Sequence, residues 1–326
     1  MLKLFRAYVA LIAMAFFSTV LSPAWAQDFP NKPIHLVVPF GPGGATDIVG
    51  RVLAEKMSDI LKQPVIVENR SGAGGLVGTT HVMRSEPDGH TLLMATIGFG
   101  ANPALFGDRL PFDPVKDFTP VSMLVNVPTV LVVHPSVPAR SAKELVELAM
   151  KEPGTLNFGS AGYGTVNHLA GEMMKFMADI DMVHIPYRSG SASSTAVVAG
   201  EISMLFATTP TALPFIASDR LIPLAASGVN PLAQLPDVPL LQETIPGFNV
   251  VEWQGVVGPA GIPRPVVDKL NAAIVEALHD PAVTKRLIEL GTEVVASSPE
   301  ELAAHVKSEV DRWNEVSART GMTAKD

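Results

Sequence analysis

Short apolar runs alternate with longer amphipathic stretches along most of this 326-residue chain. Several runs lack polar alternation, which is typical of strands buried on both faces of a sheet. The predicted strands are 34–39, 65–68, 91–95, 130–133, 156–158, 183–186, 202–206, 222–225 and 250–257. Apolar residues at helical spacing predict helices at 46–60, 75–85, 142–151, 166–177, 191–199, 265–279, 282–290 and 299–317. This alternation predicts an α/β fold.

Two extended stretches, 121–133 and 248–257, contain no strong turn signal and are interpreted as crossovers between two lobes. The first lobe then combines residues 27–127 with 250–326, and the second lobe is the middle segment, 128–249. Each lobe is predicted to be a mostly parallel sheet flanked by helices. Two crossings make a hinge, and hinged lobes close on a ligand, so we expect a ligand cleft between them.

The N-terminus reads as a targeting segment. Lys3 and Arg6 precede an apolar run at 7–21, and Pro-Ala-Trp-Ala follows at 23–26. A basic start, a short apolar run and small residues predict a secretory signal peptide spanning residues 1–26. The run is shorter than the roughly 20 residues that cross a bilayer, which disfavours the alternative of a membrane anchor. The mature protein is therefore expected to be soluble and exported to the periplasm.

Charge and composition exclude several classes of function. The net charge is −8 at pH 7, and removing Lys3 and Arg6 with the signal peptide makes it more negative. A strongly acidic chain is a poor partner for nucleic acid or anionic membrane surfaces. The chain has no cysteine, which excludes disulfides, thiolate catalysis and cysteine-ligated metals.

A glycine-rich turn at 40–47, Phe-Gly-Pro-Gly-Gly-Ala-Thr-Asp, separates the first predicted strand from a helix. The start of a helix offers free N–H groups and a positive dipole end, and glycine lets a ligand approach the backbone. No Walker loop is present, and Thr46 and Val77 stand where a dinucleotide loop needs its third glycine. A carboxylate therefore fits this turn better than a phosphate cofactor.

Similar turns follow other predicted strands, at 69–75, 95–98, 159–165 and 187–191. Each alone is more often an ordinary tight turn than a site, but five in both predicted lobes are harder to dismiss. Asp47 either complements the helix dipole, the more common role, or holds its glycine loop in place. Arg188 either pairs with a ligand carboxylate or forms a surface salt bridge.

Catalytic and metal-binding patterns are weak. Ser160 lies in Gly-Ser-Ala-Gly, which lacks the spacing of a hydrolase nucleophile. His168 and Glu172 stand four apart on one helix, but no second metal-ligand pair accompanies them, so a packing role is favoured. His168 near a helix start could also donate to a ligand. No enzyme activity, metal or cofactor is expected; a two-lobed hydrolase using Ser160 is kept as an alternative.

Motifs along the whole mature chain resemble the Bug family, the substrate-binding receptors of tripartite tricarboxylate transporters. The segments that carry this resemblance are 33–34, 38–47, 67–75, 88–93, 110–114, 157–162, 164–165, 168–169, 183–188, 235–239 and 258–263. The resemblance implies a two-lobed periplasmic-binding-protein (Venus flytrap) fold. It also implies that the turns at 40–46 and 160–165 hold a carboxylate through backbone N–H groups, hydroxyls and water. A separate pair of integral-membrane permease subunits would be the partner, and the receptor itself is expected to be a monomer.

The chain departs from the family pattern at Ala207, where relatives commonly carry Asp. If this position faces the cleft, a partner for an ammonium group is lost, and the ligand is expected to be an aliphatic or aromatic dicarboxylate without a demanding cationic group. A sensor for a membrane kinase would share this binding chemistry and stays an alternative. The predicted ligand-binding residues are Phe40, Gly41, Gly43, Gly44, Thr46, Asp47, Thr96, Ser160, Gly164, Thr165, His168, Tyr187 and Thr208.

Overall fold

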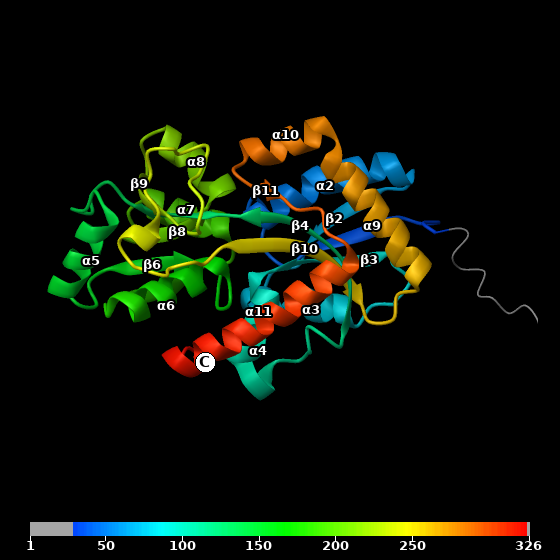
Figure 1. Cartoon of the computed structure of the whole chain (residues 1–326), viewed down its shortest axis with the longest axis horizontal. Coiled ribbons are helices and arrows are strands. Elements are labelled where there is room, and N and C mark those ends of the chain that lie inside the picture. Colours follow the sequence, from blue (N-terminus) through cyan, green and yellow to red (C-terminus); the bar gives the residue numbers. More distant parts are fainter. Residues whose placement is uncertain (1–28, 325–326) are drawn as a thin grey trace, which may run out of the picture.

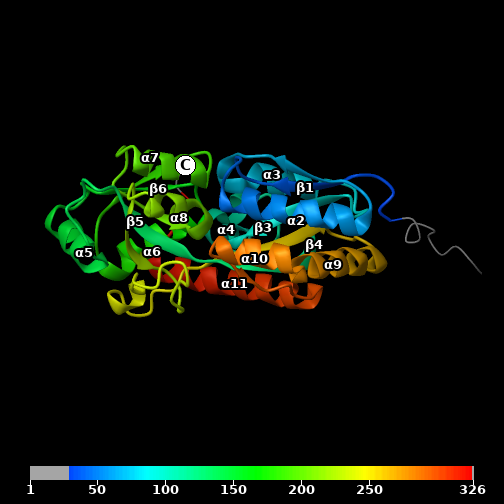
Figure 2. The same cartoon turned by 90° about the horizontal axis from the view of Figure 1, so that it is seen from above.

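The computed structural model describes residues 29–324, and the predicted signal peptide lies outside this range. Two α/β lobes lie side by side along the longest axis of the molecule (Figure 1). Seen from above, the helices of each lobe flank its sheet (Figure 2). The chain thus forms a two-lobed α/β fold with one sheet in each lobe.

The first lobe contains a six-stranded sheet in the order β11-β4-β10-β3-β1-β2. Strand β1 pairs in parallel with β2 and β3, whereas β10 runs antiparallel to both β3 and β4, and β11 runs antiparallel to β4. The strands are β1 (Ile34–Val38), β2 (Val65–Asn69), β3 (Thr91–Thr96), β4 (Phe118–Val127), β10 (Glu252–Pro259) and β11 (Glu293–Val294).

Both faces of this sheet are covered by helices. Apolar residues of β1 alternate between two buried clusters, with Val37 in one and Leu36 and Val38 in the other. Helices α3, α4 and α11 supply the first cluster and α2, α9 and α10 the second. The helices of this lobe are α2 (Ala45–Leu61), α3 (Leu76–Met83), α4 (Ile97–Phe106), α9 (Arg264–His279), α10 (Pro281–Glu289) and α11 (Pro299–Thr320), with short 3₁₀ turns η2 (Ala73–Gly75) and η3 (Gly107–Arg109).

The second lobe contains a five-stranded sheet in the order β7-β6-β8-β5-β9. Strand β6 pairs in parallel with β7 and β8, and β5 runs antiparallel to β8 and β9. Its strands are β5 (Thr129–Val133), β6 (Asn157–Ser160), β7 (Val183–Pro186), β8 (Met204–Thr208) and β9 (Ile222–Ala226). Its helices are α5 (Ala142–Lys151), α6 (Val166–Ala178), α7 (Gly190–Val198) and α8 (Thr209–Ala217), with the 3₁₀ turn η4 (Leu241–Glu243).

The chain crosses between the lobes in extended conformation. Strand β4 of the first lobe ends at Val127, and β5 of the second begins at Thr129, with only Pro128 between them. The return crossing enters β10 at Glu252 (Figure 1). These crossing strands run antiparallel to their neighbours, so the pairing in both sheets is more mixed than the sequence analysis predicts.

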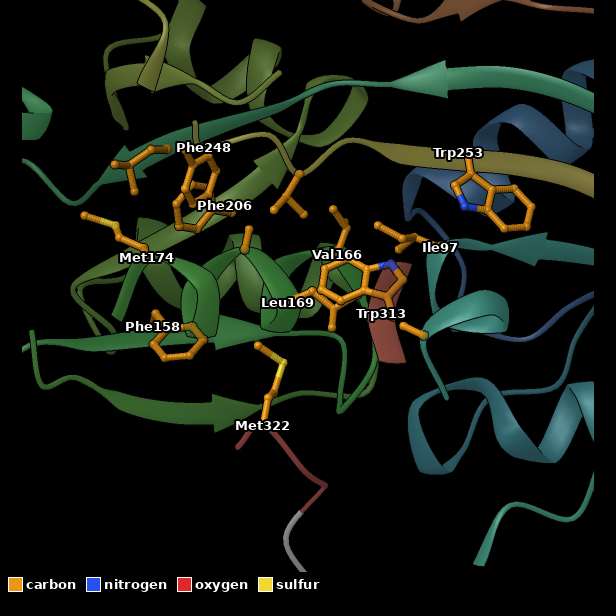
Figure 3. Close-up of a cluster of buried hydrophobic side chains, with 14 of the residues drawn as sticks. Ile97, Phe158, Val166, Leu169, Met174, Phe206, Phe248, Trp253, Trp313 and Met322 are labelled. Carbon is orange, nitrogen blue, oxygen red and sulfur yellow. The ribbon is translucent and has the colours of Figure 1, made fainter. Parts of the chain in front are cut away.

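The apolar core continues from one lobe into the other. Ile97 of α4 and Trp313 of α11 belong to the same buried cluster as Val166 and Leu169 of α6. Met322, in the segment after α11, joins this cluster as well. Figure 3 shows these side chains where the two lobes meet. The C-terminal helix and its tail therefore belong to the first lobe by sheet contacts but pack against both.

Candidate functional site

A small cavity of about 40 Å³ lies between the lobes, at the starts of several helices. We call it the inner cavity. Both lobes line it, with Phe40, Gly44, Ala45, Thr46, Asp47, Glu252 and Gln254 from the first and Ala161, Thr165, Val166, Asn167, Gly190 and Thr208 from the second. The volume is about three times the minimum of roughly 10–15 Å³ that one water molecule needs. It suits one small polar group rather than a whole organic acid.

Helices from opposite lobes point their N-termini at this cavity. Gly44 is the N-cap of α2 and Thr165 the N-cap of α6, and neither helix has a side-chain cap. The first intrahelical bonds run from Ile48 N–H to the carbonyl of Gly44 and from Leu169 N–H to that of Thr165. The amides of the first turn therefore have no intrahelical acceptor. Two such helix starts give the inner cavity the donors and the field that an anion prefers.

Asp47 has a structural role in this turn. Its carboxylate accepts hydrogen bonds from the Gly43 N–H at 3.0 Å, from Arg51 at 2.9 and 3.0 Å and from the Asn69 side chain at 2.9 Å. Burial acts to raise the pKa of Asp47, but the hydrogen bonds from Arg51, Gly43 and Asn69 outweigh it and leave the pKa lowered. Asp47 is therefore an anion already satisfied by the protein, and it fixes the conformation of the glycine turn.

The glycines of the turns allow the two lobes to touch. A side chain at Gly74 would place its Cβ 2.2 Å from the carbonyl oxygen of Tyr163, and one at Gly98 would come within 2.7 Å of the carbonyl of Gly164. Across the same junction, the Ser191 hydroxyl donates to the carbonyl of Pro42 at 3.0 Å. The lobes are thus in direct backbone contact on this side of the molecule.

A second cavity of about 370 Å³, the outer cavity, adjoins the inner one. The two share Phe40 and Ala161 in their linings. The outer cavity is mostly apolar, and Tyr187 and the exposed Arg188 are among the residues that line it. Together the cavities form a cleft with several polar side chains at its inner end and a roomier, more apolar outer part.

The predicted site residues separate into three groups. Those that line the inner cavity are Phe40, Gly44, Thr46, Asp47, Thr165 and Thr208. Tyr187 lines the outer cavity. Outside both linings lie Gly41, Gly43, Thr96, Ser160, Gly164 and His168. Gly41 and Gly43 instead face Ser189 and Ser191 of the other lobe, and Thr96 is the N-cap of α4.

Ser160 and His184 form a hydrogen-bonded pair at 2.6 Å, but the pair lacks the properties of a catalytic dyad. The Ser160 hydroxyl accepts from the Gly162 N–H at 2.9 Å and is fully buried. Burial, followed by the charge of Lys175, lowers the pKa of His184 to about 4. Ser160 lines neither cavity, and the pair instead holds the turn that leads into α6.

His168 stabilises the same turn through a hydrogen bond. Its Nδ1 accepts from the Gly164 N–H at 3.3 Å, and its ring packs edge-on against Tyr163. Burial, then the nearby His184 and Lys175, lower the pKa of His168 to about 3. Glu172, its potential partner in a metal pair, is bonded to Lys175 at 3.4 Å. Within residues 29–324, no three His, Asp or Glu side chains are grouped to hold a metal.

Several residues of the inner cavity were not predicted from the sequence, and two of them are the polar side chains Glu252 and Gln254 of β10. They alternate along an otherwise apolar strand, which places both on one face, and this alternation was the available signal. The Glu252 carboxyl accepts from the N–H of Ile97 at 2.8 Å, and burial raises its pKa to about 8.

Ala207, by contrast, is buried in the core of the second lobe and does not line the inner cavity. The inference about ammonium groups drawn from Ala207 therefore loses its basis.

The comparisons with known proteins place this architecture in a family. The model of the tripartite tricarboxylate transporter family receptor, TctC, matches residues 49–322. The chain belongs to this family. It is 37% identical over 313 residues to the UPF0065 protein in the tcbD-tcbE intergenic region of Pseudomonas sp. strain P51, covering 95% of this chain and 93% of that one.

Several solved structures superpose closely on this chain. The periplasmic binding protein BugD has a TM-score of 0.88 at 34% identity, covering 91% of this chain and 100% of its own. The Rhodopseudomonas palustris proteins Rpa4515, with adipate, and MatC, with bound malate, have TM-scores of 0.87 and 0.85 at 30% and 32% identity. They cover 90% and 88% of this chain and 99% of their own. The resemblance to Bug receptors is thereby confirmed.

Between Phe29 and Ala324, the helices are too short or too polar to span a bilayer.

Proposed function

We propose that this protein is a periplasmic receptor that captures a dicarboxylate and delivers it to the permease subunits of a tripartite tricarboxylate transporter. The observation that carries the proposal is the pair of uncapped helix starts, α2 and α6, that face one cavity from opposite lobes. A ligand held by both helix starts favours the closed arrangement of the lobes. That coupling is what a transport receptor needs.

The shape of the cleft favours a ligand with two ends. One carboxylate fits the inner cavity, on the N–H groups at the starts of α2 and α6. The carbon chain then lies in the apolar outer cavity, and a second carboxylate reaches Arg188 in its lining. Similar receptors carry adipate and malate, both dicarboxylates, which agrees with this division. The ligand-binding set we propose is Phe40, Gly44, Thr46, Thr165, Tyr187, Arg188 and Thr208.

The test is a thermal-shift screen of the mature protein with mono-, di- and tricarboxylates. A bound ligand at 100 times its dissociation constant adds about 2.7 kcal/mol to stability. For a chain of this length that raises the unfolding midpoint by a few degrees. We expect dicarboxylates to give the largest shift. A broad panel without any shift would refute the proposal.

Two variants examine the two ends of the cleft. Gly44 has φ −80°, and a Cβ there would come no closer than 3.9 Å to other atoms, so Gly44→Val folds but fills the inner cavity. It should abolish binding of every carboxylate, while the stability of the free protein falls only by about 1 kcal/mol because valine is a poorer N-cap than glycine. Arg188→Gln should weaken a dicarboxylate but not the monocarboxylate of equal length. Arg319→Gln, on the exposed end of α11, is the matched control.

A further inference from the structure

Gln254 presents an unused hydrogen-bond acceptor to the inner cavity. Its side chain is fully buried, and its Nε2 donates to the Thr46 hydroxyl at 3.3 Å. Its Oε1 is buried and has no hydrogen-bond partner among the described residues. Because an unpaired buried acceptor destabilises a protein, such an oxygen in a ligand cavity points to a donor on the ligand.

Thr46 supplies the complementary donor beside it. Since its oxygen accepts from Gln254, its own proton remains free to donate, and Thr46 also lines the inner cavity. The Thr46 hydroxyl and the Gln254 Oε1 therefore lie close together, because the Nε2 of the same Gln254 amide is bonded to Thr46. One is a free donor and the other a free acceptor. A ligand that bonds to both groups carries an acceptor and a donor on adjoining carbons.

The acceptor on the ligand is its carboxylate, because the same wall of the cavity holds the free amides at the start of α2. The donor then lies on the adjoining carbon. A hydroxyl group or an ammonium group could occupy that position.

The charges around the cavity favour the hydroxyl. An ammonium group needs an anionic partner, and the cavity lining contains two carboxyl groups, Asp47 and Glu252. Asp47 is already paired with Arg51 and Asn69. Glu252 accepts from the Ile97 N–H, and burial raises its pKa to about 8, so it is mostly neutral at pH 7. Neither carboxyl group offers an ammonium a free negative charge.

We propose that the inner cavity selects a 2-hydroxycarboxylate, with the Thr46 hydroxyl donating to the carboxylate and Gln254 Oε1 accepting from the 2-hydroxyl. This selection rests on the proposed receptor function and narrows its ligand class. Gln254 is then the residue that distinguishes hydroxy acids from their deoxy analogues.

Matched ligand pairs test the selection on the unaltered protein by isothermal titration calorimetry. The pairs are malate with succinate, lactate with propionate and mandelate with phenylacetate; aspartate tests the ammonium. In any pair that binds, the hydroxy acid should bind at least about tenfold tighter than its deoxy analogue, which corresponds to a difference of roughly 1.4 kcal/mol in binding free energy. Aspartate should bind no better than succinate.

The failures are distinguishable. Equal affinity within the binding pairs, or a preference for aspartate over malate, overturns the hydroxyl selection and leaves the carboxylate receptor standing. Absence of binding by every carboxylate overturns the receptor function, and the selection falls with it.

Variants test whether Gln254 and Thr46 make the contacts proposed for them. Gln254→Met keeps the length of the side chain but removes the acceptor, so within this variant the hydroxy acid and its deoxy partner should bind with equal affinity. Gln63→Met, in the turn between α2 and β2, is the matched control. Thr46→Val should weaken both members of a pair equally, and Thr46→Ser should restore them. A hydroxyl preference that survives in folded Gln254→Met contradicts the assignment.

Discussion

The lobes meet in two zones of opposite chemistry. In the glycine zone, Gly74 and Gly98 of the first lobe lie against the backbone of Tyr163 and Gly164 of the second. Gly43 lies against the small side chain of Ser191. In the tryptophan zone, Trp313 packs in one apolar cluster with Ile97, Val166, Leu169 and Met322 (Figure 3). The first zone is polar and nearly free of side chains, and the second is a continuous core.

This difference indicates how the lobes separate. Water replaces the polar contacts of the glycine zone at little cost, whereas opening the tryptophan zone exposes apolar surface at about 25 cal/mol per Å². The tryptophan zone also adjoins a crossing strand, because the indoles of Trp253 in β10 and Trp313 both donate to Glu309. We therefore expect the lobes to open at the glycine zone, next to the inner cavity, and to pivot at the tryptophan zone.

The largest expected effect belongs to the tryptophan zone. Trp313 is 2% exposed, and Trp313→Ala removes its packing and its hydrogen bond to Glu309. We expect the free energy of unfolding to fall by about 3–5 kcal/mol, measured by denaturant titration. Phe176→Ala, at a side chain that is 47% exposed, should change it by less than about 0.5 kcal/mol. If Trp313→Ala lowers the free energy of unfolding by less than about 1 kcal/mol, as a surface substitution does, this zone is not a packed core.

His168, which holds the turn at Gly164 in the glycine zone, should make the stability of the protein depend on pH. His168 accepts from the Gly164 N–H, and its pKa falls from 6.5 to about 3 on folding because it is buried. Below pH 6.5 the unfolded chain binds a proton that the folded protein does not, so stability falls as the pH falls from 6.5 towards 3. The slope from this group reaches about 1.4 kcal/mol per pH unit.

Denaturant titrations across that pH range measure this slope. His168→Gln should reduce the slope by about one proton's contribution, while the exposed His279→Gln should leave it unchanged. An identical slope in His168→Gln and the unaltered protein would show that His168 is not held neutral.

The smallest expected effect concerns the glycine zone itself. At Gly74 (φ 63°, ψ 23°) an added Cβ would meet the Tyr163 carbonyl at 2.2 Å. Gly321 has nearly the same backbone (φ 69°, ψ 14°) and no atom within 4 Å. Both alanine variants should lose about 1 kcal/mol of stability through the left-handed backbone. Only Gly74→Ala should also weaken carboxylate binding, by about tenfold, because it opposes closure. Equal affinities in calorimetry would contradict a role for glycine-zone contact in binding.

Much of the fold could be predicted from local patterns, and the misses have local reasons. The run of Val, Ile and Leu in β1 predicts a strand buried on both faces, and both faces are covered. Helices α4 and α8 were missed because they contain Pro103 and Pro214 and have little amphipathic contrast. The extended run at 121–133 was read as one crossover, whereas Pro128 divides it into β4 and β5.

For the candidate site, the sequence indicated turns rather than contacts. The glycine turn at 40–47 and the turn before α6 could be found because strand, glycine and helix start follow one another along the chain. The alternation of Glu252 and Gln254 along β10 places them on one face, but they lie about 200 residues from Thr46 in the chain, so the sequence did not show that this face meets the cavity.

Taken alone, the order of residues determined the layers, the helix starts and the family, because these depend on local periodicity, backbone preferences and short motifs. Only the packing of the two lobes decided which groups share a cavity and which merely let backbones touch. Gly43 and Gly44 are neighbours in the chain, yet one faces Ser191 across the junction and the other lines the inner cavity. The reason is physical: whether a donor is free or an acceptor unpaired is set by distant segments that approach only after folding.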